Sequence, residues 1–286
     1  MYLWVLYTLK IGIFSTLSNL HSVKLSSDDL KFLQFVKNMP ELSVLKIEKN
    51  QIMDFSPLMN KTTLIDLSID LASTKSKEKI TAIDTLKNLQ VLKLTGNGEY
   101  DISLSHLNAL KALVVDEYWQ TDKFKISDCP FLHHLSVSGD LYKVLFNSTQ
   151  KLHKLDVSSQ MLTDSFYQEL QHVKILELRD CRVYQTKAIS RTTLEDLVIE
   201  DSTLESDLPS LLAASPSLKT IKIVNSNLDN VVIFKKFRQL SELDIQKNSV
   251  ESISELNDLS QFKVLTITDN PVTDSAALNK KVVVFN

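Results

Sequence analysis

The sequence predicts an α/β fold in which one strand-and-return unit is stacked many times along a single axis. Three observations support this prediction: a frame of apolar positions that recurs about every 22 residues, a strand-like spacing inside each unit, and a return segment with apolar residues about three apart. Stacking such units would place the strands side by side in a parallel β-sheet. The returns would form the opposite layer, mostly as 3₁₀ turns and short helices.

Residues 240–262 show the unit most clearly. Leu243 and Ile245 are two residues apart, so a strand would bury both side chains on one face. Asn248 then marks a turn. The apolar residues of the return are three apart, as in a 3₁₀ helix, and are Ile253, Leu256 and Leu259. One unit cannot bury its apolar side alone, so it needs copies on either side.

The copies cover most of the chain. The first frame positions are Leu20, Leu42, Leu64, Leu89, Leu110, Leu132, Leu152, Val173, Leu194, Leu218, Leu240 and Phe262. Three residues later come Val23, Leu45, Leu67, Leu92, Leu113, Leu135, Leu155, Leu176, Leu197, Ile221, Leu243 and Leu265. Two further on come Leu25, Ile47, Ile69, Leu94, Val115, Val137, Val157, Leu178, Ile199, Ile223, Ile245 and Ile267. All thirty-six residues are aliphatic or Phe, which chance does not produce in a chain that is 43% hydrophobic.

From about Leu17 onward this pattern resembles the leucine-rich repeat, and most closely its 22-residue SDS22-like and internalin-like class. The resemblance implies a right-handed, curved solenoid (a horseshoe) with the parallel sheet on its concave face. It also implies a non-catalytic module for protein–protein interaction, acting as a scaffold, adaptor or regulatory subunit. The alternative function is a secreted or cell-surface recognition protein of the host–microbe or innate-immune type.

In that family an Asn in the turn after the strand bonds to backbone groups and forms a ladder. Here the slot holds Asn50, Asn97, Asn248 and Asn270, and elsewhere Asp28, Ala72, Tyr118, Asp140, Gln160, Cys181, Ser202 and Ser226. Asp, Ser, Cys and Gln can make part of the same bonds. Ala72 and Tyr118 cannot, so their turns are expected to be irregular, with a polar loop after Ala72. Helical turns are expected at residues 163–170 and from Leu208 to near Pro216.

The ends of the chain differ from the repeats. Residues 1–19 are expected to form a cap strand, in which Leu6, Leu9 and Ile11 repeat the frame and cover the edge of the first repeat. A signal peptide and a membrane anchor are the alternatives, although Lys10 interrupts the apolar run. Residues 20–278 would hold the twelve repeats. Residues 279–286 would add a closing strand around Val282, Val284 and Phe285.

Composition limits the function further. The net charge is −3, with 32 basic and 35 acidic residues, so nucleic acid is not the expected partner. The two cysteines, Cys129 and Cys181, fall in different repeats and are expected to be buried thiols. This cysteine usage favours an intracellular location, with secretion as the alternative if residues 1–18 are a signal peptide. No catalytic or phosphate-binding motif occurs, so no enzyme activity and no cofactor are expected.

A binding surface is predicted on the outward positions of the strands. Acidic side chains gather there in repeats seven to nine, at Asp156, Glu177, Asp196 and Glu200. They would form a docking strip for a protein with a basic surface. The alternative is local compensation, because Lys154 and Arg179 are on the same face. We expect a monomer without membrane association.

Three further features are weaker signals: an aromatic pair, a group of histidines near a cysteine, and two sequons. Tyr118 and Trp119 are a second candidate binding pair, or else a Trp that covers an irregular turn. A metal site at His133, His134, His153 and Cys129 is not expected, because Cys129 would point inward and His134 outward. Two sequons begin at Asn60 and Asn147 and matter only for a secreted chain.

Overall fold

The computed structural model describes most of the chain. The described residues are 2–6, 18–28, 30–71, 81–96, 103–116, 125–138, 145–146, 152–159, 161–162, 166, 169–183, 191–204, 208–278 and 281–285. They form two compact units, which we call unit 1 (Met1–Lys151) and unit 2 (Leu152–Asn286).

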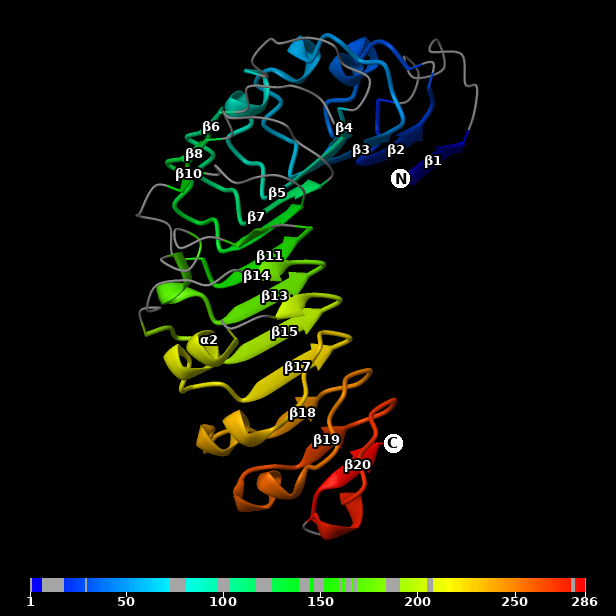
Figure 1. Cartoon of the computed structure of the whole chain (residues 1–286). Coiled ribbons are helices and arrows are strands. Elements are labelled where there is room, and N and C mark those ends of the chain that lie inside the picture. Colours follow the sequence, from blue (N-terminus) through cyan, green and yellow to red (C-terminus); the bar gives the residue numbers. More distant parts are fainter. Residues whose placement is uncertain are drawn as a thin grey trace. The chain divides into compact units, whose positions relative to one another are not determined.

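Unit 1 is built on a parallel sheet whose strands follow one another in chain order (Figure 1). Its main strands are β1 (Tyr2–Leu6), β2 (Ser22–Ser26), β3 (Val44–Glu48), β4 (Asp66–Asp70), β5 (Val91–Thr95), β7 (Ala112–Asp116) and β9 (His134–Ser138). The opposite layer holds the 3₁₀ helices η2 (Gln34–Asn38), η3 (Ser56–Leu58) and η4 (Ile83–Thr85). A smaller parallel sheet has the order β10 (Leu145–Phe146), β8 (Lys125–Ser127), β6 (Ser103–Ser105).

Unit 2 repeats this arrangement. Its main strands are β11 (Lys154–Ser158), β13 (Ile175–Arg179), β15 (Asp196–Glu200), β17 (Thr220–Val224), β18 (Glu242–Asp244), β19 (Val264–Thr266) and β20 (Val283–Phe285). Its returns include η5 (Glu169–His172), α2 (Leu208–Ala214), η6 (Val232–Lys236), η7 (Ser254–Asp258) and η8 (Ser275–Ala277). A second small sheet joins β12 (Met161–Leu162), β14 (Arg182–Val183) and β16 (Thr203–Leu204). The predicted fold class, a leucine-rich repeat solenoid with a parallel sheet and 3₁₀ turns, is confirmed.

The predicted apolar frame forms the core of both units. All thirty-six frame positions are buried, with exposed fractions between 0% and 7%. The strand register explains this, because equivalent frame positions face each other across neighbouring strands: Leu176 is opposite Leu155 on one side and Leu197 on the other. Each repeat therefore completes the burial of the repeats beside it.

The predicted ladder of the turns is present in unit 2. The amide of Asn248 accepts bonds from the N–H groups of Ser226 and Leu228 (3.0 Å each) and donates to three backbone carbonyls. Where Asn is replaced, a hydroxyl takes over: the N–H of Cys181 donates to Ser202 Oγ (3.0 Å). The N–H of Ser202 likewise donates to Ser226 Oγ (3.2 Å). Asn97, Ala72 and Tyr118 lie outside the described residues, so their turns stay predictions.

Each of these turns begins with a residue in the left-handed region. In unit 2 the positive φ angles just before the ladder position are 53° at Ser159, 50° at Asp180 and Asp201, 48° at Asn225, 55° at Lys247 and 60° at Asp269. Asp and Asn adopt this conformation more readily than most side chains. In unit 1 Gly96 takes it at no steric cost, with φ at 110°. This backbone reversal lets the chain leave the sheet after five residues or fewer.

The predicted helix after residue 207 is confirmed as α2, which buries Leu208, Leu211 and Leu212. Beyond its end, Ser215 Oγ donates to the Leu211 carbonyl (2.7 Å) and contacts Thr192 Oγ1 of the preceding return (2.8 Å). The other predicted helical segment, residues 163–170, overlaps η5 only at its end. Residues 163–165 and 167–168 lie outside the described part of the chain.

Strands are found near both ends. β1 pairs with β2 in parallel, but Leu3 and Val5 are opposite Val23 and Leu25. The frame predicted for Leu6, Leu9 and Ile11 is therefore wrong in register, and Leu9 and Ile11 themselves lie outside the described residues. β20 pairs with β19 and begins at Val283. None of the described helices is long and apolar enough to span a bilayer.

We predict that Leu176→Ala lowers the free energy of unfolding by about 2–5 kcal/mol, because it leaves a cavity at a fully buried position. Urea unfolding followed by circular dichroism measures the loss. Gln261→Ala, at an exposed position, is the control and should change little. A loss below about 0.5 kcal/mol for Leu176→Ala would contradict the inward assignment of this frame position.

Candidate functional site

The solvent-facing side of each main sheet carries a regular array of half-buried side chains. We call it the sheet face. In β11, β15 and β17 the burial pattern alternates between intermediate and buried residues, so every second side chain points away from the core. Neighbouring strands are about 4.8 Å apart, and the register is fixed by the apolar frame. A side chain on the sheet face is thus held at a defined place relative to its neighbours.

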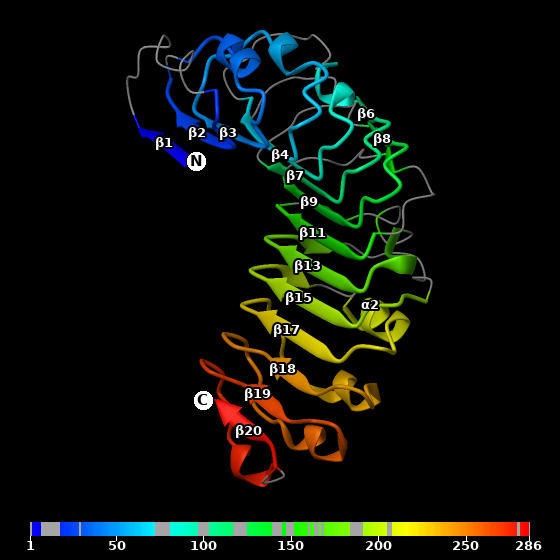
Figure 2. The ribbon, with the colours of Figure 1, turned by 180° about the vertical axis from the view of Figure 1, so that it is seen from behind.

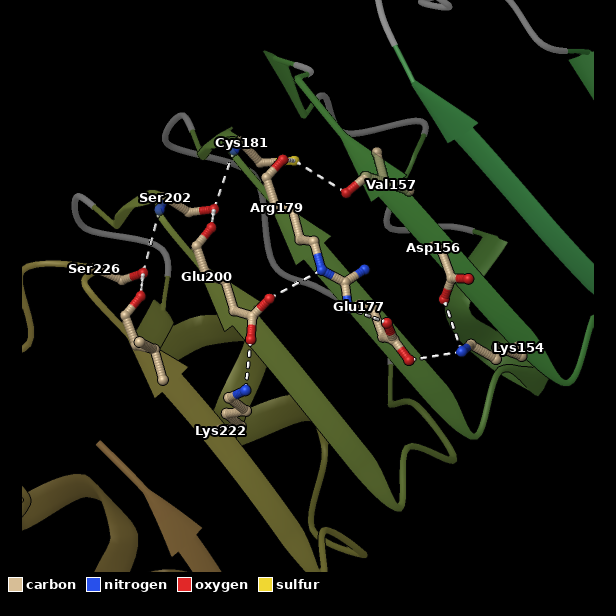
Figure 3. A network of polar contacts seen from close by, with 11 residues as sticks. Lys154, Asp156, Val157, Glu177, Arg179, Cys181, Glu200, Ser202, Lys222 and Ser226 are labelled. Carbon is tan, nitrogen blue, oxygen red and sulfur yellow. Dashed lines mark hydrogen bonds and ion pairs between the residues drawn. The ribbon is translucent and has the colours of Figure 1, made fainter. Parts of the chain in front are cut away.

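The sheet face of unit 2 contains a chain of ion pairs that crosses four strands (Figure 3). Lys154 Nζ of β11 lies 2.6 Å from Glu177 Oε1 of β13 and 3.4 Å from Asp156 Oδ1. Arg179 bridges Glu177 (2.5 Å) and Glu200 of β15 (2.9 Å). Lys222 Nζ of β17 completes the chain at 2.6 Å from Glu200 Oε1. We call these six residues the ion-pair network: Lys154, Asp156, Glu177, Arg179, Glu200 and Lys222.

The network shifts the pKa values of three of its members, Lys154, Arg179 and Glu200, toward their charged forms. The hydrogen bond from Lys222 lowers the pKa of Glu200, aided by Arg179 and opposed by burial. Burial alone would lower the pKa of Lys154, but its bonds to Glu177 and Asp156 outweigh burial, and the pKa is raised. Burial likewise opposes the charge of Arg179, and the bonds to Glu177 and Glu200 raise its pKa. The bonds of the network therefore favour the charged forms of Lys154, Arg179 and Glu200.

The predicted site residues fall into three groups. Asp156, Glu177 and Glu200 are brought together in the network, where nearby cations compensate them, as the alternative interpretation proposed. Asp196 lies on the same sheet face but has no ion pair among the described residues. Tyr118 and Trp119 lie outside the described part of the chain. Sequence reasoning did not assign Lys222 to this cluster, although its outward frame position could have suggested it.

The sheet face of unit 1 carries shorter pairings. Lys24 bonds to Glu48 at 2.7 Å, and Lys46 bonds to Asp66 at 3.0 Å. Lys93 lies 3.4 Å from Asp116, which also accepts a bond from Ser138 Oγ (2.8 Å). Each of these three lysines is thus compensated by a carboxylate on a neighbouring strand.

The cysteines and histidines form no site in the described residues. Cys129 and Cys181 are buried free thiols, as predicted. Burial raises the pKa of the Cys129 thiol, which opposes a reactive thiolate. Cys181 Sγ instead lies 3.5 Å from the Val157 carbonyl, within the turn ladder (Figure 3). In the part of the chain that is described, no group of three His, Cys, Asp or Glu side chains is placed to hold a metal ion.

Glu195 forms a separate charged site beside the start of β15. Its carboxylate lies 2.8 Å from Lys174 Nζ and 2.5 Å from Lys219 Nζ, one residue from each of the neighbouring repeats. The hydrogen bond from Lys174, with that from Lys219, lowers its pKa from 4.5 to about 2, against a smaller opposing effect of burial. Glu195 thus links three repeats through charge-assisted bonds.

We predict that Glu195 titrates at about 2 in the folded chain, well below its ordinary 4.5. A lowered folded-state pKa means that this stabilisation is complete above pH 4.5 and is lost as the pH falls toward about 2. Carbon-13 NMR of the side-chain carboxyl group measures the midpoint, and urea unfolding measures the stability. In Glu195→Gln this part of the pH dependence should disappear. A midpoint near 4.5 would show that the two lysines do not hold the carboxylate.

Comparisons with known proteins bear on the fold. No family model matches the chain. A curated relative, the transforming growth factor beta activator LRRC33 of Danio rerio, is 24% identical over 262 residues. This match covers 90% of the chain but only 35% of the relative, so the chain spans about a third of that protein's length.

Solved structures give the same fold at low identity. A leucine-rich repeat protein of Leptospira interrogans matches with a TM-score of 0.62 at 15% identity, over 96% of this chain and 74% of that chain. The Drosophila Toll–Spätzle complex matches with a TM-score of 0.65 at 15% identity, over 98% of this chain and 45% of that chain. TLR13 in complex with ssRNA13 matches with a TM-score of 0.54 at 18% identity, over 95% of this chain and 50% of that chain. By its fold, the chain is a leucine-rich repeat protein.

Proposed function

We propose that this chain is a non-catalytic module that binds a protein on its sheet face, as a scaffold, adaptor or regulatory subunit. The observation that carries the proposal is the fixed array of charged side chains on unit 2. Its members are held by the strand register and by ion pairs of 2.5–3.4 Å, so they need little ordering when a partner binds. The Toll–Spätzle complex, a protein–protein complex by its name, supports this choice by analogy.

The charge of the sheet face favours a basic partner surface over nucleic acid. The outward positions of the main strands of unit 2 carry six carboxylates and three cations. The carboxylates are Asp156, Glu177, Asp196, Glu200, Glu242 and Asp244, and the cations are Lys154, Arg179 and Lys222. This excess of negative charge would repel phosphates and would speed the approach of a basic protein. TLR13, which is solved with ssRNA13, shows that the fold alone does not decide between these partner classes.

We predict that Asp196→Arg weakens partner binding at least about tenfold, because it reverses a charge on the sheet face without breaking an ion pair of the described network. Asp258→Arg is the matched control, since it makes the same change at an exposed position of η7. Partners are first captured from the native source on the unchanged chain and on each variant, and their amounts are compared. The affinity of the isolated partner for each of the three proteins is then measured. The proposal fails if partners bind both variants as well as the unchanged chain, or if both variants lose binding equally.

A second candidate function is recognition of a protein outside the cell. The similarity to a transforming growth factor beta activator favours it, and residues 1–18 would then be a signal peptide. The sequon at Asn60 offers a test. Asn60 lies in an exposed turn after η3, with φ at 59°, and Thr62 of the sequon is exposed as well. The second sequon, at Asn147, lies outside the described residues.

We predict that Asn60 carries an N-linked glycan if the chain is secreted. Enzymatic deglycosylation of the natural protein in ¹⁸O water, followed by mass spectrometry, would mark Asn60 as a converted Asp. Asn38 is the matched internal control, because it lies 22 residues earlier at the equivalent exposed position but is followed by Met39 and Pro40, with no hydroxyl. An unmodified Asn60 together with a retained Met1 would count against secretion and favour the intracellular module.

A further inference from the structure

The last three strands of unit 2 present a different surface from the ion-pair network. Figure 2 shows β18, β19 and β20 side by side. Their parallel register places six outward residues in two rows across the strands. One row is Glu242, Val264 and Val283, and the other is Asp244, Thr266 and Phe285. We call these six residues the β18–β20 patch.

The β20 side of the patch is apolar and exposed. Val283 is 54% exposed and Phe285 is 53% exposed, while Val264 and Thr266 beside them on β19 are half-buried. A large apolar side chain and a branched one are thus open to solvent on the same face. Covering them with another apolar side chain would remove this area from water.

The β18 side of the patch is acidic, and none of the six patch residues carries a positive charge. Asp244 accepts two bonds from the neutral amide of Gln246 (2.9 and 3.0 Å), which leaves its charge in place. Lys222, opposite Asp244 on β17, makes its ion pair with Glu200 (2.6 Å) and acts on Asp244 only through a lesser coulombic attraction. Glu242 is exposed and has no ion pair among the described residues. With Lys222 shared between Glu200 and Asp244, this side keeps an excess of negative charge that would attract a cation on a ligand.

The spacing of the two sides defines the length of a ligand. β18 and β20 are separated by two strand spacings, or about 10 Å. An extended peptide advances about 3.3 Å per residue, so three residues cover this distance. An apolar side chain over Val283 and Phe285 would then carry a cation three residues away over Glu242 and Asp244.

We propose that the β18–β20 patch binds an extended protein segment in which a large apolar residue lies about three residues from a Lys or Arg. This inference rests on the proposed protein-binding function and names the chemistry of the segment that the sheet face accepts. An acidic segment would meet Glu242 and Asp244 with like charge, and a purely basic segment would leave Val283 and Phe285 uncovered.

The test uses the full chain with carbon-13-labelled Val methyl groups and three acetylated peptide amides, of sequence KSSLSSK, ESSLSSE and KSSSSSK. We expect KSSLSSK to shift the methyl signals of Val264 and Val283 and to bind at least about tenfold more tightly than either of the others. Equal binding of ESSLSSE would overturn the proposal. Shifts confined to other valines, or no shift with several millimolar KSSLSSK, would overturn it as well.

Matched variants locate the effect. Phe285→Ser should weaken KSSLSSK binding, whereas Val232→Ser, which removes a similarly exposed side chain (52%) from η6, should not. Glu242→Gln with Asp244→Asn should weaken it too, whereas Glu251→Gln with Asp258→Asn at exposed positions outside the main strands should not. All four variants change solvent-accessible side chains, and thermal unfolding checks that they fold. If KSSLSSK does not bind the β18–β20 patch but Asp196→Arg still weakens capture of a natural partner, this inference is wrong and the proposed function stands.

Discussion

The structure depends on one interaction, the burial of each repeat's apolar residues against those of the repeats on either side. Leu176, between Leu155 and Leu197, is an example: its position is fully buried only because equivalent residues lie in register on both neighbouring strands. Burial contributes roughly 25 cal/mol per Å² of apolar area removed from water, and all thirty-six frame positions take part in it. A single repeat has no other way to remove this surface from water, and this is why the units are stacked.

The same constraint creates the sheet face. Because the apolar residues fix the register, the alternate side chains of every strand are placed at regular intervals on the other side. In unit 2 this regularity turns separate charges into the ion-pair network: Glu177 accepts from Lys154 on one side and Arg179 on the other, and Arg179 also reaches Glu200 (Figure 3). The turn ladder of Cys181, Ser202 and Ser226 joins the turns that follow β13, β15 and β17. Core, turn and surface thus share one repeat spacing.

The repeat frame also explains why the charged surface could be predicted only in part. The outward direction of Asp156, Glu177, Asp196 and Glu200 follows from their place in the frame. Their partners do not, because a salt bridge depends on side-chain rotamers and on the reach of Lys and Arg across a strand. The sequence therefore did not predict that Lys222 belongs to the network. Asp196, in the same acidic group, has no ion pair among the described residues. The strand near the first residues shows the same limit, since its register places Leu3 and Val5, rather than Leu9 and Ile11, opposite Val23 and Leu25.

The sequence by itself determined the repeat, its core residues, the parallel sheet, the helix at Leu208–Ala214 and the free, buried state of Cys129 and Cys181. These features depend on patterns of hydrophobicity and turn residues within one repeat, and such patterns can be identified directly in the sequence. Only the tertiary structure decided which charges meet, which hydroxyls replace Asn in the ladder, and that the exposed Val283 and Phe285 lie two strands from Glu242 and Asp244. Those features join atoms from repeats about 20–25 residues apart, and their geometry is set by packing rather than by local sequence.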